Sequence, residues 1–272
     1  MNELHLFAGA GGGILGSELL GIRTVCAVEL EPYPASVLLA RQNDGLLPPF
    51  PVWDDVRTFD GRPWRGLVDV VSGGFPCQDI SAAGKGAGID GARSGLWREM
   101  HRIINEVRPE FAFLENSPLL VGRGLARILG DLAEIGYDAE WLVLGADDVG
   151  APHVRKRIWI LGVDRNADCI REEIDNCGFT VSNAPYQGDV RGDGEFSENE
   201  RPGSQGNYHA GRAETNDCGE WWSAEPDVGR VAHGVAARVD RLKAIGNGQV
   251  PAVAATAFRV LLGRFQEGKE GE

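Results

Sequence analysis

LHLFAGAGGGILG, residues 4–16, is the stretch that points most directly to a fold class. The apolar run at 4–7 predicts a strand, and the glycine-rich turn after it predicts a helix over residues 14–20. A strand, a glycine turn and a helix open many nucleotide-binding domains, because glycines let the backbone approach a ligand closely. The literal G-x-G-x-x-G spacing is supplied by Gly11, Gly13 and Gly16.

Glu29 strengthens the prediction of a nucleotide or nucleoside site. It follows the next apolar run, residues 24–28, and lies 18 residues beyond Gly11, where an acid can bind ribose hydroxyls. NAD, FAD and S-adenosylmethionine all fit such a loop. A tight strand–helix turn without any ligand is the remaining interpretation.

Farther along, short apolar runs alternate with helical patterns up to residue 163, which is the order of βαβ units around a mostly parallel sheet. We therefore predict an α/β, Rossmann-like large domain over residues 1–163. The expected strands, besides those above, cover residues 67–72, 111–114 and 158–163, and the expected helices cover residues 95–107 and 125–135.

The composition changes after residue 163. Residues 164–230 contain 15 acidic and 6 basic residues and show little apolar periodicity. We predict a small irregular second domain over residues 164–241 and a return to the large domain over residues 242–272. In the returning part we expect a loop at 245–251, a helix at 252–265 and a frayed end at 263–272.

Charge and cysteine content exclude several classes of protein. The chain has 272 residues and a net charge of −13, which excludes a globally basic DNA-coating protein. It shows neither a basic segment followed by an apolar one at its start nor an apolar run of about 18 residues, so we expect a soluble, cytoplasmic protein without a membrane span. Five irregularly spaced cysteines without a CxxC predict no disulfide framework and no metal site.

Cys77 is a candidate nucleophile. It lies in GGFPCQ, residues 73–78, directly after an apolar strand and so at the carboxyl edge of the predicted sheet, where catalytic groups gather. A buried structural thiol is the commoner fate of cysteine, but the flanking Gly pair, Pro76 and Gln78 do not suit a packed core. A nucleophilic thiol with an ordinary pKa near ~8.5 also needs local activation.

Glu115 follows another apolar strand, in LENSP at residues 114–118, and is expected at the same edge as Cys77. Partial burial there would raise the pKa of its carboxyl and let it donate a proton to a substrate nitrogen. The neighbouring Asn, Ser and Pro are equally typical of a plain turn or helix cap.

Taken together, these motifs resemble the DNA cytosine-C5 methyltransferases. In that family's order, residues 7–13 are similar to its first motif, 74–78 to its nucleophile motif and 115–116 to its E-N motif. Arg155 and Arg157 resemble its basic pair, although His153 stands where the family usually has Gln. Residues 241–251 resemble its closing block.

The resemblance implies a Rossmann-like, S-adenosylmethionine-dependent methyltransferase domain with a mostly parallel sheet, plus a small target-recognition domain. It implies methyl transfer to C5 of a flipped cytosine in double-stranded DNA through a covalent bond between Cys77 and C6. The implied catalytic residues are Cys77, Glu115, Arg155 and Arg157. The implied cofactor contacts are Phe7, Ala8, Gly9, Gly11, Gly12, Glu29, Asp55 and Asn247, and the implied DNA contacts are Gln78, Ser81, Lys85, Arg93 and Arg241.

A monomeric restriction-modification or phage protective methylase, paired functionally with an endonuclease, is the expected role. Three alternatives remain at this stage. An NAD-dependent oxidoreductase would explain the glycine turn but not Cys77 or Glu115, and binding of NAD against S-adenosylmethionine separates the two. Methylation of RNA cytosine is scarcely distinguished by the motifs. A binding protein that uses its acidic segment on a protein partner would lack methyl transfer altogether.

Overall fold

A seven-stranded sheet organises the computed structural model, which describes residues 1–76, 95–166 and 238–270. Its strand order is β3-β2-β1-β4-β5-β7-β6. The strands are β1 (Asn2–Leu6), β2 (Arg23–Val28), β3 (Val52–Trp53), β4 (Val70–Gly74), β5 (Phe111–Asn116), β6 (Tyr137–Leu144) and β7 (Arg157–Asp164).

The five strands β1 to β5 are parallel, and β7 runs antiparallel between β5 and β6. The predicted mostly parallel α/β sheet is therefore confirmed. From β1 the chain builds outward through β2 to β3 and then returns to add β4 and β5 on the other side. This reversal of direction makes the carboxyl ends of β1 and β4 a topological switch point, where ligands of open α/β sheets bind.

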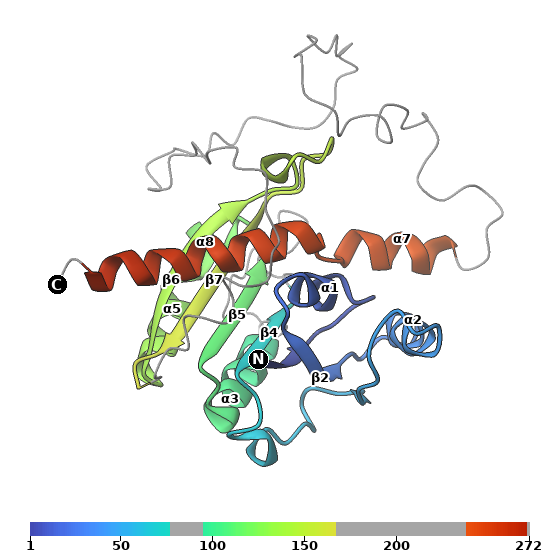
Figure 1. The fold of residues 1–272 in the computed structure, drawn as a ribbon, viewed down its shortest axis with the longest axis horizontal. Helices are drawn as coiled ribbons and strands as arrows, with labels where there is room; N and C mark the ends of the chain where they lie inside the picture. The colour runs from blue at the N-terminus through green and yellow to red at the C-terminus, as the bar shows by residue number, and fades with distance from the viewer. Residues whose placement is uncertain (77–94, 167–237, 271–272) are drawn as a thin grey trace, which may run out of the picture.

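Helices cover both faces of the sheet (Figure 1). Their bounds are α1 (Gly12–Leu19), α2 (Pro32–Asn43), α3 (Gly95–Val107), α4 (Leu120–Arg123), α5 (Leu125–Glu134), α7 (Arg238–Asn247) and α8 (Pro251–Glu270), with short 3₁₀ turns η1 (Arg62–Trp64) and η3 (Asp147–Val149). One apolar core lies between the sheet and α3 and α5, and a second lies between the sheet and α8. In Figure 1, α8 crosses β6 and β7, and α7 extends from it toward α2.

The helices form where apolar residues recur at helical spacing. In α3 the buried residues are Trp97, Met100, Ile103, Ile104 and Val107, a single face of a 3.6-residue helix. The predicted helix over residues 95–107 is confirmed to the residue. Burial of that face, at roughly 1.5–3 kcal/mol for each large side chain, contributes much of the stability of this layer.

Two expectations about the C-terminal part were wrong. The helix that follows the closing block does not fray from residue 263, because α8 continues to Glu270. The expected loop at 245–251 is shorter, because α7 continues to Asn247. Phe258 and Leu261 are fully buried against the sheet, and this burial anchors the middle of α8. The expected small domain falls almost entirely in residues 167–237, outside the described residues.

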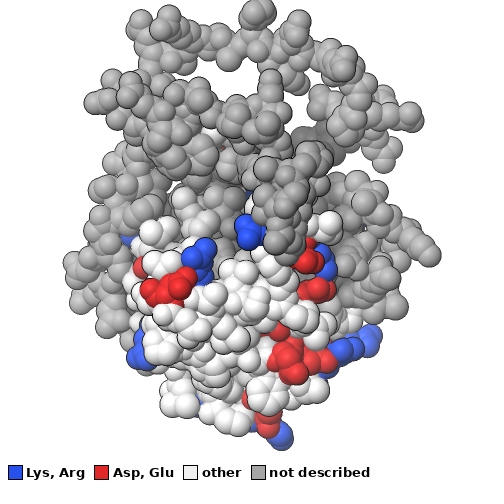
Figure 2. Space-filling model, turned by 90° about the vertical axis from the view of Figure 1, so that its right-hand side faces the viewer, with Lys and Arg blue, Asp and Glu red and all other residues white. Residues whose placement is uncertain are grey.

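Charged side chains on the described surface occur in small mixed groups. Figure 2 shows acidic and basic atoms side by side on the face turned to the viewer, with broad uncharged areas between them. Exposed ion pairs such as Arg62–Asp60, at 2.8 Å, are of this kind. Of the helices in the described ranges, none combines the length and apolarity that a bilayer crossing requires.

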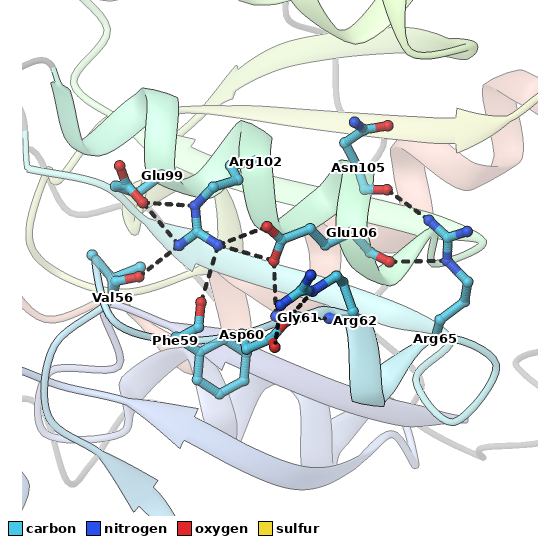
Figure 3. A network of polar contacts seen from close by, with 10 residues as sticks. All are labelled: Val56, Phe59, Asp60, Gly61, Arg62, Arg65, Glu99, Arg102, Asn105 and Glu106. Atoms are coloured by element: carbon cyan, nitrogen blue, oxygen red, sulfur yellow. Dashed lines mark hydrogen bonds and ion pairs between the residues drawn. The ribbon is translucent and has the colours of Figure 1, made fainter.

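Arg102 ties the loop after β3 to α3. Its guanidinium forms ion pairs with Glu99 at 2.8 Å and Glu106 at 2.9 Å. It also donates hydrogen bonds to the carbonyl oxygens of Val56 and Phe59, both at 3.0 Å (Figure 3). One planar, five-donor group thus satisfies four partners from two segments, which a lysine cannot do.

Replacing Arg102 by lysine is expected to lower the free energy of unfolding by about 2 kcal/mol, because hydrogen bonds to charged groups are worth about 1.5–3 kcal/mol each. Urea unfolding measures the loss. Arg62→Lys is the matched control, since Arg62 is 76% exposed and pairs with Asp60 at the surface, where an ion pair contributes about 0–1 kcal/mol. Equal losses in the two variants would contradict the special role of Arg102.

Candidate active site

Three strand ends bring the candidate residues to one edge of the sheet. In the β1–β4 pair, Leu6 lies opposite Gly73, and in the β4–β5 pair, Gly74 lies opposite Glu115. The glycine turn follows β1 directly, and residues 75–76 follow β4. The glycine turn, residues 73–76 and Glu115 therefore lie at the carboxyl ends of neighbouring parallel strands.

The turn after β1 depends on unusual backbone angles. Phe7 has φ 54°, Gly9 φ 55° and Gly11 φ 92°, all in the left-handed region. For a bulky residue such as Phe7 this conformation costs of order 1–3 kcal/mol and is typical of functional turns. A hydrogen bond from the N–H of Ala8 to the carbonyl of Val28, at 3.0 Å, anchors the turn to the next strand.

Glu29 is held at the end of β2 as a ligand-binding acid would be. Its carboxylate accepts hydrogen bonds from the backbone N–H groups of Gly9, at 2.6 Å, and Glu31, at 2.7 Å. Burial raises the pKa of Glu29, and these two backbone donors oppose the rise. No atom of the described residues lies within 4 Å of the position where a side chain on Gly9 would begin, so the turn is open beside this acid.

The two remaining predicted cofactor contacts, Asp55 and Asn247, lie outside the glycine turn and β2. Asp55 forms an ion pair with Arg57 at 2.6 Å, and hydrogen bonds from Arg57 hold the pKa of the Asp55 carboxyl below its usual range. Asn247 is the last residue of α7 and is exposed. The ion pair between Lys243 of α7 and Glu31, at 2.9 Å, brings α7 toward the start of α2.

Glu115 and Arg157 contact each other at the carboxyl edge of the sheet. The Nε atom of Arg157 lies 2.8 Å from a carboxylate oxygen of Glu115, whose side chain is only 12% exposed. Burial raises the pKa of Glu115, and the charges of Arg157 and Arg155 together with hydrogen bonds from Gln249 and Arg157 oppose the rise. The net direction is upward, so Glu115 keeps its proton to a higher pH than an ordinary carboxyl group.

Arg155 binds backbone carbonyl groups of the closing block, a contact that its sequence motif did not predict. Its guanidinium donates hydrogen bonds to the carbonyl oxygens of Gly246, at 2.7 Å, and Gly248, at 2.6 Å. It therefore holds the junction between α7 and α8 against the start of β7. The expected catalytic role of Arg155 is accordingly joined by a structural one, while Arg157 is the arginine in contact with Glu115.

Asn116 fixes the segment that leads to Cys77. Its side-chain amide donates a hydrogen bond to the carbonyl of Phe75 at 3.0 Å, and its oxygen accepts one from the N–H of Ser117 at 2.8 Å. Cys77 itself lies outside the described residues, as do the predicted DNA contacts Gln78, Ser81, Lys85 and Arg93. Arg241 is exposed on α7.

Sequence reasoning missed Gln249, although it lies inside the closing block. Its side chain hydrogen-bonds to Glu115, and its backbone carbonyl packs against Gly12. Any Cβ on Gly12 would collide with that carbonyl, and a Cβ on Gly16 would lie 2.8 Å from Ala254. Several glycines of the turn thus serve close packing of α1 against the end of the chain, in addition to any ligand.

Comparison with known proteins agrees with this geometry. The model of the family described as C-5 cytosine-specific DNA methylase matches residues 1–205. The Type II methyltransferases M.PspPI of Psychrobacter sp. and M.Eco47II of Escherichia coli are each 37% identical, over 165 and 169 residues, and each match covers 59% of this chain. The chain spans 39% of the length of these two relatives.

Among solved structures, the methyltransferase EhMeth of Entamoeba histolytica superposes with a TM-score of 0.51 at 17% identity, covering 60% of this chain and 52% of that chain. This likeness shows the fold alone. The fold is thus a Rossmann-like methyltransferase fold. Since the family match covers most of the sequence, the chain belongs to the C-5 cytosine-specific DNA methylase family. This membership replaces the oxidoreductase interpretation of the glycine turn.

Gly12→Ala is expected to lower the free energy of unfolding by about 1–3 kcal/mol, because the added methyl group must displace the backbone of Gln249. Thermal or urea unfolding measures the effect. The matched control is Gly130→Ala in α5, where a Cβ meets nothing within 4 Å and alanine should stabilise the helix by about 0.5–1 kcal/mol. A neutral Gly12→Ala would show that the closing block does not rest on this glycine.

Proposed function

We propose that this protein transfers a methyl group from S-adenosylmethionine to C5 of a flipped cytosine in double-stranded DNA, through a covalent adduct of Cys77. The observation that carries the proposal is the partly buried pair of Glu115 and Arg157, with Glu115 opposite Gly74. In the sequence, Cys77 follows Gly74 by three residues. Family membership supports the reaction class.

The residues at the switch point fit the proposed cofactor. Glu29 is a fixed, partly buried acid suited to ribose hydroxyls, and the turn beside it is open at Gly9. The N-terminus of α1 supplies backbone N–H groups that could bind the carboxylate of S-adenosylmethionine. The bound cofactor would supply an electrophilic methyl group. The residues assigned to it are Phe7, Ala8, Gly9, Gly11, Gly12, Glu29, Asp55 and Asn247.

The chain's own residues would make the cytosine reactive. Cytosine C5 is a weak nucleophile, and addition of the Cys77 thiolate to C6 converts the ring into an enamine that reacts at C5. Burial raises the pKa of the Glu115 carboxyl, and this suits it to donate a proton to N3, where charge builds up. Arg157 holds Glu115 and stabilises the developing charge, and Arg155 braces the closing block beside them.

Release follows from the same adduct. Once C5 carries the methyl group, a solvent water takes up the C5 proton, the C5–C6 double bond re-forms and Cys77 leaves as a thiolate. N3 then returns its proton to Glu115. None of these atoms can be reached inside a duplex, so the target base must be flipped out at a cost of a few kcal/mol. Aromaticity is regained at the end, and the enzyme returns unchanged.

DNA contact is assigned to residues outside or at the edge of the described part. Gln78, Ser81, Lys85, Arg93 and Arg241 are the proposed DNA contacts, and residues 164–241 are the proposed target-recognition domain. With a net charge of −13 the chain depends on such local basic groups to meet phosphates. A monomer acting as a restriction-modification or phage protective methylase, alongside a functionally paired endonuclease, is the role we propose.

Cys77→Ser is expected to abolish transfer of labelled methyl from S-adenosylmethionine to mixed-sequence duplex DNA, because a serine hydroxyl is a far weaker nucleophile toward C6. The matched control is Cys26→Ala. Burial raises the pKa of the Cys26 thiol to about 12, so that residue is inert and its variant should retain activity. Labelling of RNA but not of DNA would show that RNA is the substrate. Labelling of DNA by the Cys77→Ser variant would show that Cys77 is not the nucleophile.

Glu115→Gln is expected to lower kcat/KM about 100- to 10,000-fold, the range of general acid catalysis. In the wild type, kcat/KM should fall as pH rises through the raised pKa of Glu115, since the protonated form is then lost. The variant should lack this alkaline limb. Glu140→Gln, on the exposed side of β6, is the control and should leave the profile unchanged. A pH limb that persists in Glu115→Gln would assign it to another group.

A further inference from the structure

A cluster of buried polar residues lies under α1, beside the candidate active site. We call Glu3, His5, Ser17, Thr24 and Ser72 the Glu3 cluster, and each of them is at most 7% exposed. Glu3 and His5 lie on the same face of β1, and Ser72 is opposite His5 on β4. The same small internal cavity is lined by Glu3, His5 and Ser72 and also by Glu115 and Gln249.

Glu3 is held as an ionised carboxylate. Its Oε1 accepts hydroxyl hydrogen bonds from Ser17 and Ser72, both at 2.6 Å, and its Oε2 accepts one from Thr24 at 2.7 Å. Burial alone would raise the pKa of Glu3, but the charge of His5 and the hydrogen bonds from His5 and the serines outweigh it, and the pKa is lowered.

His5 is the basic group that touches this carboxylate. Its Nδ1 lies 2.7 Å from Ser72 Oγ and 3.2 Å from Glu3 Oε1. The single hydroxyl hydrogen of Ser72 points to Glu3, so Nδ1 of His5 must carry a proton and donate it toward Ser72. The Nδ1–H of His5 thus joins the hydroxyl groups around Glu3 and Ser72, and Nε2 lies at the opposite edge of the ring.

Gln249 occupies the space between that edge and Glu115. A Cβ on Gly13 would lie 2.7 Å from His5 Nε2 and would also collide with Gln249 Oε1. A Cβ on Gly74 would lie 2.5 Å from Glu115 Oε2 and 3.1 Å from Gln249 Nε2. The amide oxygen thus faces the histidine and the amide nitrogen faces the carboxyl, and the two glycines leave the room that this arrangement needs.

We propose that Gln249 is a positioning residue for Glu115 and that the His5–Glu3 pair sets the orientation of its amide. The Glu3 carboxylate and Ser72 fix the His5 ring, and that ring lies on the side of the amide oxygen, so the amide nitrogen is directed toward Glu115. Glu115 is then held on both oxygens, by Arg157 at 2.8 Å and by Gln249. The proposal rests on the function proposed above, in which Glu115 supplies a proton to the base.

Several charged groups surround Glu115 and His5 and influence the pKa of Glu115. Glu115 faces Arg157 from β7, Arg155 from the preceding loop, and Gln249. His5 faces Glu3 on its own strand and is coupled to Glu29 at the end of β2. Removing the Gln249 donor leaves burial and the two arginines, so the pKa of Glu115 is expected to rise further.

Gln249→Met removes the amide at nearly the same volume. We expect kcat to fall about 10- to 100-fold, because a displacement of about 1 Å at a reacting group can cost 100-fold, while KM for DNA changes little. The alkaline limb of the pH profile should move to higher pH. The matched control is Gln42→Met in α2, whose side-chain oxygen accepts a hydrogen bond from the N–H of Phe50 at 3.1 Å, and it should leave kcat and the limb unchanged.

His5→Asn tests the second half of the proposal, since the Asn amide keeps a donor toward Ser72 and lacks the Nε2 edge. It should shift the limb in the same direction, and the double variant with Gln249→Met should be no slower than Gln249→Met alone, because the two residues act in series. An additive double variant, or a Gln249→Met enzyme with the wild-type pH limb, would overturn the proposal.

A readout without turnover separates this proposal from the proposed function. Carbon NMR titration of labelled glutamate carboxyls reports the pKa of Glu115 directly, with its signal assigned by loss in Glu115→Gln. The pKa should be higher in Gln249→Met than in the wild type, even if the wild type methylates no substrate. An unchanged pKa in a variant with wild-type circular dichroism would refute the positioning role, whereas inactivity of the wild type would refute only the function.

Discussion

The backbone carbonyl of Gln249 lies directly against Gly12. This contact holds α1 against the closing block, residues 241–251, and the edge of the sheet that carries Glu115 depends on it. Without a side chain at Gly12 and Gly16, α1 approaches residues 249–254 closely enough to bury Val253 and Ala254. Arg155 donates hydrogen bonds to the carbonyl oxygens of Gly246 and Gly248 in the same closing block. The edge that carries Glu115 is thereby closed by residues from both ends of the sequence.

Electrostatics at this edge follows from desolvation balanced by fixed donors. Glu115 and Glu29 are both pushed toward their protonated forms by burial, and each is opposed by hydrogen bonds from specific neighbours. Glu3, more deeply buried still, goes the other way because three hydroxyl groups and His5 meet its carboxylate. The pKa values of these three carboxyl groups thus shift in different directions, because burial dominates at Glu115 and Glu29 and the hydrogen-bonding partners dominate at Glu3.

Local pattern predicted those elements whose burial repeats with a fixed period. The helix over Gly95–Val107 was predictable because Trp97, Met100 and Ile104 fall on one face. By contrast, α2 opens on two prolines and buries only Leu38 among its described residues, so no periodic signal marks it. The strand β6 was also missed, since it is an edge strand with exposed Asp138 and Glu140. The helix α8 also runs five residues beyond its expected end at residue 265, where the sequence has no apolar periodicity.

The sequence by itself determined the α/β class, the glycine turn and the positions of Glu29 and Glu115 at the ends of strands, because each follows from neighbours a few residues away. Only the tertiary structure decided that Arg155 binds Gly246 and Gly248, 91 and 93 residues later, while Arg157 meets Glu115. It also decided that Gln249 fills the space between His5 and Glu115. Such contacts depend on the order of strands and the packing of α8 on α1, which no local spacing encodes.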